Sequence, residues 1–402
     1  MKKRFLFDQI VAHLKSTKVT VIVGARQTGK TTILKQIEAF LLQRGDRCFS
    51  FTLEDYDILS DFNHSPKNLL NAVETKGDGR VFVLIDEIQY LKDPSNFLKL
   101  IYDGYREKIK LIVTGSSSFY MDRGFKDSLA GRKRIFPLYS MSFGEFLHFK
   151  GVSPRSAKTL AGKREISGLF TEYLIWGGYP EVVMSQNEDE RMEVLRELIY
   201  SYIRKDILEQ KIKREDKFFQ LLKFLSHQAG GLLNKNEVAR NIGVSTTAVD
   251  NYLYFSQKSF HIFTLKPLYK NRQKEIVKMG KVFFGDCGIL NFLRKDFRKP
   301  EDRGKSVGSL LENAFFINLL YRVRDVEDIK FWRDKAGHEI DFVVNETTGF
   351  ELTFGCGARG TKQKNLNAFH QSFSSISVSV LCRDDVQAEL LRYPRTVGKV
   401  EF

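Results

Sequence analysis

Short apolar runs alternate with segments of helical periodicity between residues 18 and 140. The runs occupy residues 19–23, 81–85, 110–114 and 134–138. Strands of a parallel sheet read as continuous apolar runs because helices cover both faces of the sheet. The pattern therefore predicts an α/β domain with a parallel sheet, which we place at residues 1–150.

The rest of the chain shows three further patterns. Residues 151–228 begin with a polar, basic stretch and continue with helical periodicity, which predicts a helical extension. Residues 229–300 contain two short helical patterns and a basic hairpin-like segment. Residues 301–402 predict a small α/β domain, with helices at 310–321 and 362–372 and strands at 329–332, 338–344, 349–354 and 376–382.

The composition supports several buried cores, since 42% of the 402 residues are hydrophobic, and it excludes a disordered or collagen-like chain. Lys and Arg exceed Asp and Glu by 64 to 49, a formal net charge of +15. No apolar run approaches the roughly 18 residues that cross a bilayer, so we expect no membrane contact. Polar residues interrupt the apolar stretch near the N-terminus, which argues against a secretory signal and for a cytoplasmic location.

The four cysteines, Cys48, Cys287, Cys356 and Cys382, lie far apart and form no CxxC pair. This spacing argues against a zinc ribbon or a disulfide scaffold and fits a reduced compartment. We therefore expect all four to be small core residues.

One segment matches the pattern G-x-x-x-x-G-K-[ST] in full and lies between a predicted strand and a predicted helix. It comprises Gly24, Ala25, Arg26, Gln27, Thr28, Gly29, Lys30 and Thr31, with Thr32 following. Such a loop points backbone N–H groups at a phosphate at the positive end of a helix. Lys30 is expected to reach the β- and γ-phosphates and Thr31 to ligate Mg²⁺, so the segment predicts ATP and Mg²⁺ as cofactors.

Acidic and polar residues follow the next two predicted strands. Asp86 ends the run 81–85, where it can hold the Mg²⁺ shell, and Glu87 is the candidate for polarising the attacking water. Ser116 and Thr114 follow or end the run 110–114 and are candidates for sensing the γ-phosphate if this strand lies between the other two. Alternatively, the serines at 116–118 cap the following helix.

Several motifs in fixed order resemble those of the archaeal-type AAA-family ATPases, which are STAND-like P-loop proteins with a restriction-endonuclease-like C-terminal domain. The motifs are residues 21–32, 84–89, 113–117, 130–132, 137–146 and 177–181. The resemblance implies a sheet of order 5-1-4-3-2, an ATPase core, a winged helix at 229–300 and a nuclease-like tail at 301–402. It also implies that Arg132 contacts nucleotide, although a solvated basic loop shared with Lys133 and Arg134 is an equal alternative.

A helix-turn-helix is predicted by Ala239, Gly243 and Val249, which allow two helices to approach, turn and pack. Ser245 is a natural N-cap. The exposed face of the second helix would present Thr246, Thr247, Asp250, Asn251 and Tyr254. Because this face offers no Arg or Lys to read guanine, we expect weak DNA sequence specificity.

The segment 266–281 carries six basic residues and one acidic residue. They are Lys266, Lys270, Arg272, Lys274, Lys278 and Lys281, with Glu275 as the acid. We interpret it as a wing whose cations contact DNA phosphates. A solvated face and a protein-docking module are the alternatives.

The tail carries the carboxylates of a PD-(D/E)XK nuclease, which hold a metal next to a Lys that orients water. Glu312, Asp341 and Glu351 match the carboxylate positions and form a possible second metal site. Thr353 stands where the pattern has Lys, and Lys362 or Lys364 would have to substitute for it. We therefore expect weak metal binding at most and no cleavage.

Two smaller features are interpreted conservatively. Glu339 is expected to be a surface residue of its strand. The G-x-G-x-x-G pattern at 355–360 is followed by only 42 residues, too few for a dinucleotide-binding half-domain, so we do not expect it to bind a dinucleotide. The histidines show no zinc-ligand spacing, so no zinc site is predicted.

Three functions remain open from the sequence. The first is a Mg²⁺-dependent ATPase whose nucleotide state regulates binding of DNA or a protein partner through the winged helix and tail. The second is a nuclease whose cutting is gated by ATP. The third is a signalling switch that hydrolyses ATP slowly and binds a protein partner.

Overall fold

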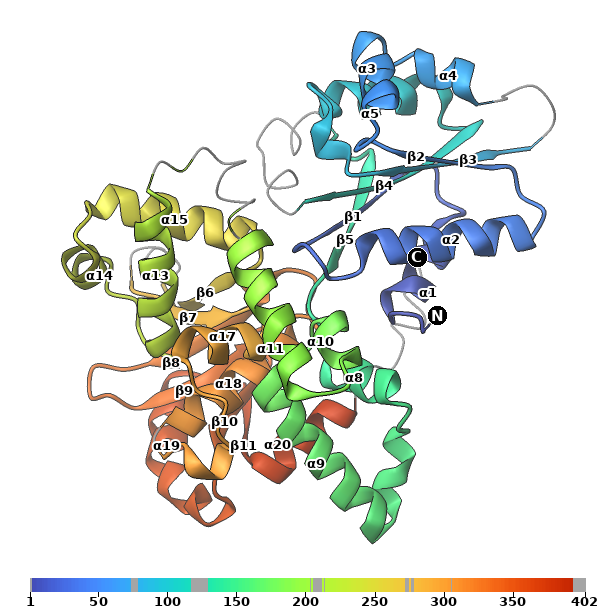
Figure 1. Ribbon diagram of the computed structural model, residues 1–402. Coiled ribbons are helices and arrows are strands. Elements are labelled where there is room, and N and C mark those ends of the chain that lie inside the picture. Colours follow the sequence, from blue (N-terminus) through green and yellow to red (C-terminus); the bar gives the residue numbers. More distant parts are fainter. Residues whose placement is uncertain are drawn as a thin grey trace. The chain divides into compact units, whose positions relative to one another are not determined.

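The computed structural model describes residues 2–73, 79–116, 129–202, 204, 212, 214–271, 275, 278–304 and 306–392 (Figure 1). Two compact units divide the chain, one within Met1–Tyr139 and one within Ser140–Arg395. Each unit has its own sheet and its own hydrophobic core.

The first unit is built on a five-stranded parallel sheet of order β2-β3-β4-β1-β5. Its strands are β1 (Val19–Gly24), β2 (Cys48–Thr52), β3 (Val81–Asp86), β4 (Ile109–Ser116) and β5 (Lys133–Leu138). All residues of β1 and β3 are buried, which explains their continuous apolar runs. The order equals the predicted 5-1-4-3-2 counted from the opposite edge, so the predicted topology is confirmed.

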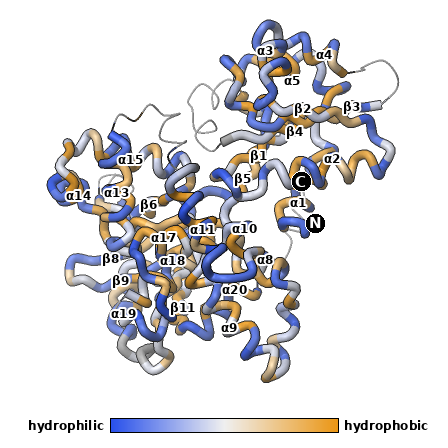
Figure 2. The backbone as a smooth tube through the Cα atoms, viewed as in Figure 1, coloured by the Kyte–Doolittle hydropathy of each residue, from blue (hydrophilic) through white to orange (hydrophobic). Residues whose placement is uncertain are grey.

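Helices cover this sheet, and Figure 2 shows hydrophobic and hydrophilic residues alternating along α2 as expected for a half-buried helix. The helices are α1 (Leu6–His13), α2 (Lys30–Gln43), α3 (Tyr56–His64), α4 (Asn68–Ala72), α5 (Pro94–Tyr105) and the short 3₁₀ turn η1 (Ile88–Tyr90). Ile10, Ile33 and Ile37 are fully buried in one cluster with strand residues such as Ile22 and Ile112. This packing fixes the start of α2 at the carboxyl edge of β1.

The second unit begins with helices, as predicted for the helical extension. They are α8 (Phe143–Lys150), η2 (Pro154–Lys158), α9 (Leu160–Trp176), α10 (Pro180–Met184), α11 (Glu188–Glu197), the π-helical turn η3 (Leu198–Tyr202) and α13 (Glu215–His227). Ser142 and Glu145 form a reciprocal capping box that starts α8. Gly177 ends α9 at φ 77°, and a side chain there would collide with the carboxylate of Asp286.

The predicted helix-turn-helix is present as α14 (Lys235–Ile242) and α15 (Thr246–Lys258). Gly243 makes the turn at φ 68°, and the side chain of Ser245 caps α15 by accepting the N–H of Ala248. Val249 is fully buried between the helices, whereas the five residues predicted on the outer face of α15 are all exposed. The spacing of small, turn and apolar residues therefore identified this motif correctly.

A six-stranded mixed sheet of order β11-β10-β9-β8-β6-β7 forms the rest of the unit. Its strands are β6 (Ile262–Pro267), β7 (Lys281–Phe284), β8 (Ile329–Arg333), β9 (Glu339–Val344), β10 (Thr348–Thr353) and β11 (Ser377–Cys382). Its helices are α17 (Cys287–Arg294), η4 (Pro300–Asp302), α18 (Ser306–Leu319), η5 (Val326–Asp328), η6 (Cys356–Lys362), α19 (Gln363–Ser372) and α20 (Arg383–Leu391). Pairing of Lys266 with Lys330 carries the sheet across residue 300, where the sequence placed a domain boundary.

The expectation that no cysteine forms a disulfide is wrong for one pair. Cys356 and Cys382 are bonded, with their Cα atoms 4.9 Å apart. Their meeting follows from the parallel pairing of β10 with β11, which sets Thr353 opposite Cys382. Cys287 is buried as expected, and Cys48 is half-buried. The cysteines thus no longer support the predicted reducing compartment.

None of the helices in the described ranges combines the length and hydrophobicity that crossing a membrane requires.

Candidate active site

The segment after β1 folds into a tight loop at the start of α2. Gly29 adopts φ 98°, and a side chain on Gly24 would lie 2.3 Å from the carbonyl oxygen of Leu138, so the glycines are sterically required. Lys30 is 6% exposed, and its Nζ donates to the carbonyls of Gly24 and Ala25, each at 3.1 Å. The Thr28 hydroxyl donates to Ala25 O at 2.8 Å. The loop is therefore closed around the lysine ammonium.

Asp86 stands beside this loop, although 55 residues separate it from Thr31 in the chain. The Thr31 hydroxyl donates to Asp86 Oδ2 at 2.7 Å, and the Thr114 hydroxyl donates to Oδ1. The hydroxyl and carboxylate oxygens form the hard donor set that Mg²⁺ prefers, so the two predicted ligands fit this ion. The order β3-β4-β1 explains how the fold brings them together.

Glu87 leaves the strand in a left-handed conformation, at φ 57°. Such a backbone is unfavourable for a residue with a side chain, and here the N–H of Glu87 donates to Thr114 Oγ1 at 3.1 Å and Gln89 Nε2 donates to its carboxylate. Thr114 therefore holds both acidic residues at once. Ser116, the other candidate sensor, pairs in register with Gly24, and its side chain lies outside the described residues.

Arg132 does not lie near this loop, contrary to the expectation of a nucleotide contact. Its carbonyl accepts the N–H of Val19, at the opposite end of β1 from Gly24. The six residues of β1 separate the two ends by about 16 Å. The guanidinium instead pairs with Asp103 of α5, Nε to Oδ1 at 2.7 Å, which lowers the pKa of Asp103.

Arg4 is a site residue that the sequence did not reveal. It is 4% exposed, and its guanidinium donates to Thr28 O at 2.7 Å and to Tyr139 O at 2.9 Å. It therefore ties the phosphate loop to the end of β5. In the sequence it stands in a basic N-terminal run that reads as surface charge, and nothing local distinguishes it.

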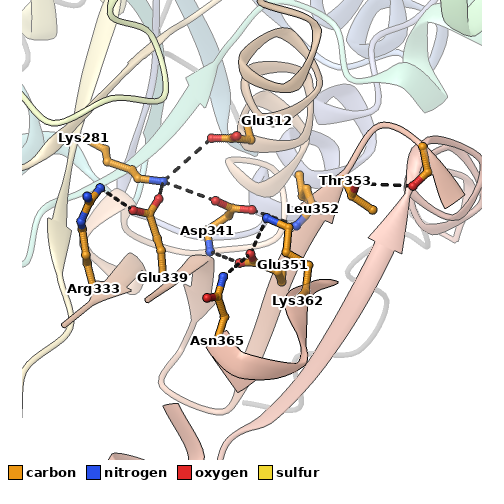
Figure 3. Close-up of polar contacts among 11 residues, drawn as sticks. Lys281, Glu312, Arg333, Glu339, Asp341, Glu351, Leu352, Thr353, Lys362 and Asn365 are labelled. Carbon is orange, nitrogen blue, oxygen red and sulfur yellow. Dashed lines mark hydrogen bonds and ion pairs between the residues drawn. The ribbon is translucent and has the colours of Figure 1, made fainter. Parts of the chain in front are cut away.

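A second polar cluster occupies the mixed sheet, at the positions predicted for a nuclease. Figure 3 shows Lys281 of β7 pointing among Glu312 of α18 and Glu339 and Asp341 of β9. Its Nζ lies 3.4 Å from Asp341 Oδ1 and 3.9 Å from Glu312 Oε2, and it contacts Glu339. These carboxylates raise the pKa of Lys281 against the opposing effect of its burial.

Glu351 lies on the other side of Asp341 and is also tightly bonded (Figure 3). It accepts from Lys362 Nζ at 2.7 Å, from Asn365 Nδ2 at 3.0 Å and from the N–H of Asp341 at 3.2 Å. Burial and the nearby Asp341 raise the pKa of both Glu351 and Glu312. The Thr353 hydroxyl donates to Gly355 O at 3.4 Å.

This arrangement corrects three sequence-based expectations. The Lys281 ammonium lies beside Glu312 and Asp341, and no set of His, Cys, Asp and Glu in the described ranges is placed to hold a metal, which argues against the possible metal site of Glu312, Asp341 and Glu351. Glu339 is a partner of Lys281 and not a free surface residue. Lys281 is 2% exposed and so cannot contact DNA phosphates.

Two family models match successive segments of the chain. Residues 16–147 match the family model of an AAA domain. The chain therefore carries an AAA domain of the P-loop type. Residues 167–300 match the model of a domain of unknown function.

Relatives extend along most of the chain. An uncharacterized protein of Methanocaldococcus jannaschii is 24% identical over 98% of this chain and 86% of its own length. An uncharacterized protein of Haemophilus influenzae is 26% identical over 84% of this chain and 82% of its own length. Among solved structures, the Aeropyrum pernix ORC1 protein in complex with DNA matches 72% of this chain and 91% of its own, with 13% identity and a TM-score of 0.32. Thermotoga maritima RuvB matches 69% of this chain and 95% of its own, with 15% identity and a TM-score of 0.34.

The basic segment after the AAA domain and helices is only partly available for binding. Lys270 and Lys278 are exposed, whereas Lys266 pairs with Glu327 at 2.9 Å. Arg272 and Lys274 lie outside the described residues. Three of the predicted phosphate contacts are therefore exposed in the described part of the chain, and one of them, Lys266, already pairs with a carboxylate.

Proposed function

We propose that this chain is a Mg²⁺-dependent ATPase whose nucleotide state regulates binding of DNA by its second unit. The observation that carries the proposal is the bond from Thr31 to Asp86, with Glu87 immediately beyond. It joins the two halves of a nucleotide site that the sequence predicts separately, on a sheet of P-loop order.

The residues of the AAA domain divide the work of hydrolysis. Backbone N–H groups of the loop and the Lys30 ammonium bind the β- and γ-phosphates. Thr31 and Asp86 would hold Mg²⁺, which neutralises charge that develops on the phosphate oxygens. Glu87 orients the attacking water and accepts its proton. Thr114 keeps both carboxylates in position through its two hydrogen bonds.

The second unit offers a DNA-binding surface on α15. Thr246, Thr247 and Asn251 can donate to and accept from base edges and phosphates. Because the five exposed residues of this face of α15 include no Arg or Lys, we propose weak sequence preference, with affinity supplied by the exposed cations Lys270 and Lys278.

Duplex DNA is expected to bind in a salt-dependent manner and to change the rate of ATP hydrolysis. Replacing Lys270 and Lys278 with Gln should reduce the slope of log affinity against log salt by about 2, because each lost phosphate contact removes about 0.9. The measurement is fluorescence anisotropy of labelled duplex at several salt concentrations, together with phosphate release with and without duplex. The control is a variant with Lys158→Gln and Lys163→Gln, because these two lysines are also exposed but lie outside the basic segment.

An unchanged slope in the Lys270/Lys278 variant would contradict DNA binding by this segment. If, in addition, duplex DNA did not change the rate of ATP hydrolysis, the two results would favour the signalling switch that docks a protein partner.

We also propose that the tail does not cut DNA. The ammonium of Lys281 already neutralises the carboxylates that would hold a metal, and Thr353 supplies no charge near an attacking water. Wild type and Thr353→Lys should both leave supercoiled and branched DNA intact in Mg²⁺ or Mn²⁺. Cleavage by the wild type that Asp341→Ala abolishes would instead establish the ATP-gated nuclease.

A further inference from the structure

Two adjoining cavities lie in the second unit, and the larger is bordered by Gly231 and Ser309, close to Glu312 of the second polar cluster. The larger has a volume of about 820 Å³ and the smaller about 400 Å³, and Lys295 and Phe297 line both. These volumes fall in the range of ligand sites in proteins, roughly 300–1,000 Å³. Because they share Lys295 and Phe297, the cavities are immediate neighbours.

The larger cavity gathers cationic side chains. Arg294, Lys295 and Arg298 line it, together with the carboxylate of Asp296. Arg294 is held rigidly, its Nε donating to Ser226 O at 2.6 Å and its Nη2 to Ser309 Oγ at 3.2 Å. Neither partner is charged, so the guanidinium charge stays uncompensated by these bonds.

Positive charge exceeds negative charge around this cavity. Arg298 binds Asp296 at 2.9 Å and lowers the pKa of that carboxyl to about 2. Burial is the main cause that lowers the pKa of Arg294 to about 10, and repulsion from the neighbouring Arg303 adds to it while Asp296 opposes it. An anion placed here would relieve that repulsion, and arginine binds phosphate with paired hydrogen bonds.

The smaller cavity is lined mainly by apolar groups. Tyr200, Phe292 and Phe297 line it, and Tyr200 is 46% exposed. The Tyr200 and Phe292 rings meet edge to face, with centroids 6.1 Å apart, while Phe297 stacks on Trp176 at 4.8 Å. Rings supported in this way offer faces against which a planar base can stack.

We propose that the two cavities together bind one nucleoside phosphate unit. The phosphate lies in the larger cavity against Arg294 and Lys295, and the base packs on the aromatic side chains of the smaller one. A single strand of nucleic acid and a free mononucleotide both present this chemistry. The site lies outside α15 and the basic segment, so the proposal does not rest on the proposed function.

The test uses the full chain carrying Lys30→Ala, which is expected to weaken nucleotide binding at the phosphate loop. One arm measures anisotropy of a labelled oligothymidylate of about ten nucleotides, and the other measures binding of thymidine monophosphate by calorimetry. Tyr200→Ala should weaken binding about tenfold or more, as loss of base stacking does. Lys295→Asn should weaken it and, for the strand, reduce the salt slope by about 0.7.

Both substitutions suit their positions. Tyr200 and Lys295 are exposed, and asparagine tolerates the left-handed backbone of Lys295, φ 56°. The control is Lys299→Asn, an exposed residue four positions later that lines neither cavity.

Each result decides the proposal. If the labelled strand binds and both Tyr200→Ala and Lys295→Asn weaken its binding, the proposal is supported with single-stranded nucleic acid as the ligand. If only thymidine monophosphate binds and the same two substitutions weaken its binding, the proposal is supported with a free nucleotide as the ligand. Absence of binding in both arms would overturn it. The proposal would also be overturned if Lys270→Gln and Lys278→Gln weakened binding while both cavity variants bound like the wild type. That result would leave the proposed function standing.

Discussion

Glu87→Gln is expected to lower the rate of ATP hydrolysis by about 10²- to 10⁴-fold, the usual contribution of a general base. The amide is nearly isosteric with the carboxylate but cannot accept the proton of the attacking water. Because Glu87 makes none of the phosphate-loop contacts, affinity for ATP should be unchanged. Phosphate release at saturating ATP and equilibrium binding of a fluorescent ATP analogue measure the two effects separately.

Lys30→Ala provides the complementary result, since it removes the ammonium that reaches the phosphates and should weaken nucleotide binding itself. Glu107→Gln is a suitable control because Glu107 is an exposed acid of the same unit outside the site. Turnover at the wild-type rate in Glu87→Gln would remove this residue from the mechanism and direct attention to Asp86 and Thr114.

Lys281→Met is expected to reduce the free energy of unfolding of the second unit by about 3–5 kcal/mol near pH 8, because removing one member of a buried ionic cluster leaves uncompensated charge. The side chain is 2% exposed and lies among Glu312, Glu339 and Asp341. Both tryptophans, Trp176 and Trp332, belong to this unit, so urea unfolding followed by their fluorescence reports on it. Lys266→Met, which breaks an exposed pair with Glu327, should cost about 1 kcal/mol or less.

The loss in Lys281→Met should depend on pH in a definite direction. The pKa of Glu312 is raised above its usual value in the folded protein, so the folded state binds more protons and stability falls as pH rises from the ordinary carboxyl range. Without the ammonium, this pKa rises further. Unfolding measured at pH 5.5 should therefore show a smaller difference from wild type than at pH 8. An equal loss at both values would mean that packing, and not charge, is the role of Lys281.

The sequence predicted most of the first sheet and the nucleotide loop because their signals are local. Continuous apolar runs mark strands buried on both faces, and Gly29 and Lys30 occupy positions at which the loop admits few alternatives. The helix-turn-helix was predictable for the same reason, since Gly243 and Ser245 act on their own turn and helix.

Long-range partners were the part that periodicity could not supply. Arg132 sits at the far end of β1 from the loop, which becomes evident only when β1 and β5 are paired in register. Arg4 reaches Thr28 and Tyr139 across 24 and 135 residues. The disulfide joins residues 26 apart only because β11 runs parallel to β10.

By itself, the sequence determined an α/β AAA domain with a phosphate loop, a helix-turn-helix and a small α/β tail, since these depend on residues close together in the chain. Only the tertiary structure decided where each charge lies. Lys281 stands in a basic run that predicts a surface wing, yet strand pairing buries it among carboxylates contributed by β9 and α18. A charge is stabilised by whatever surrounds it in space, and that environment is assembled from segments that the chain order keeps apart.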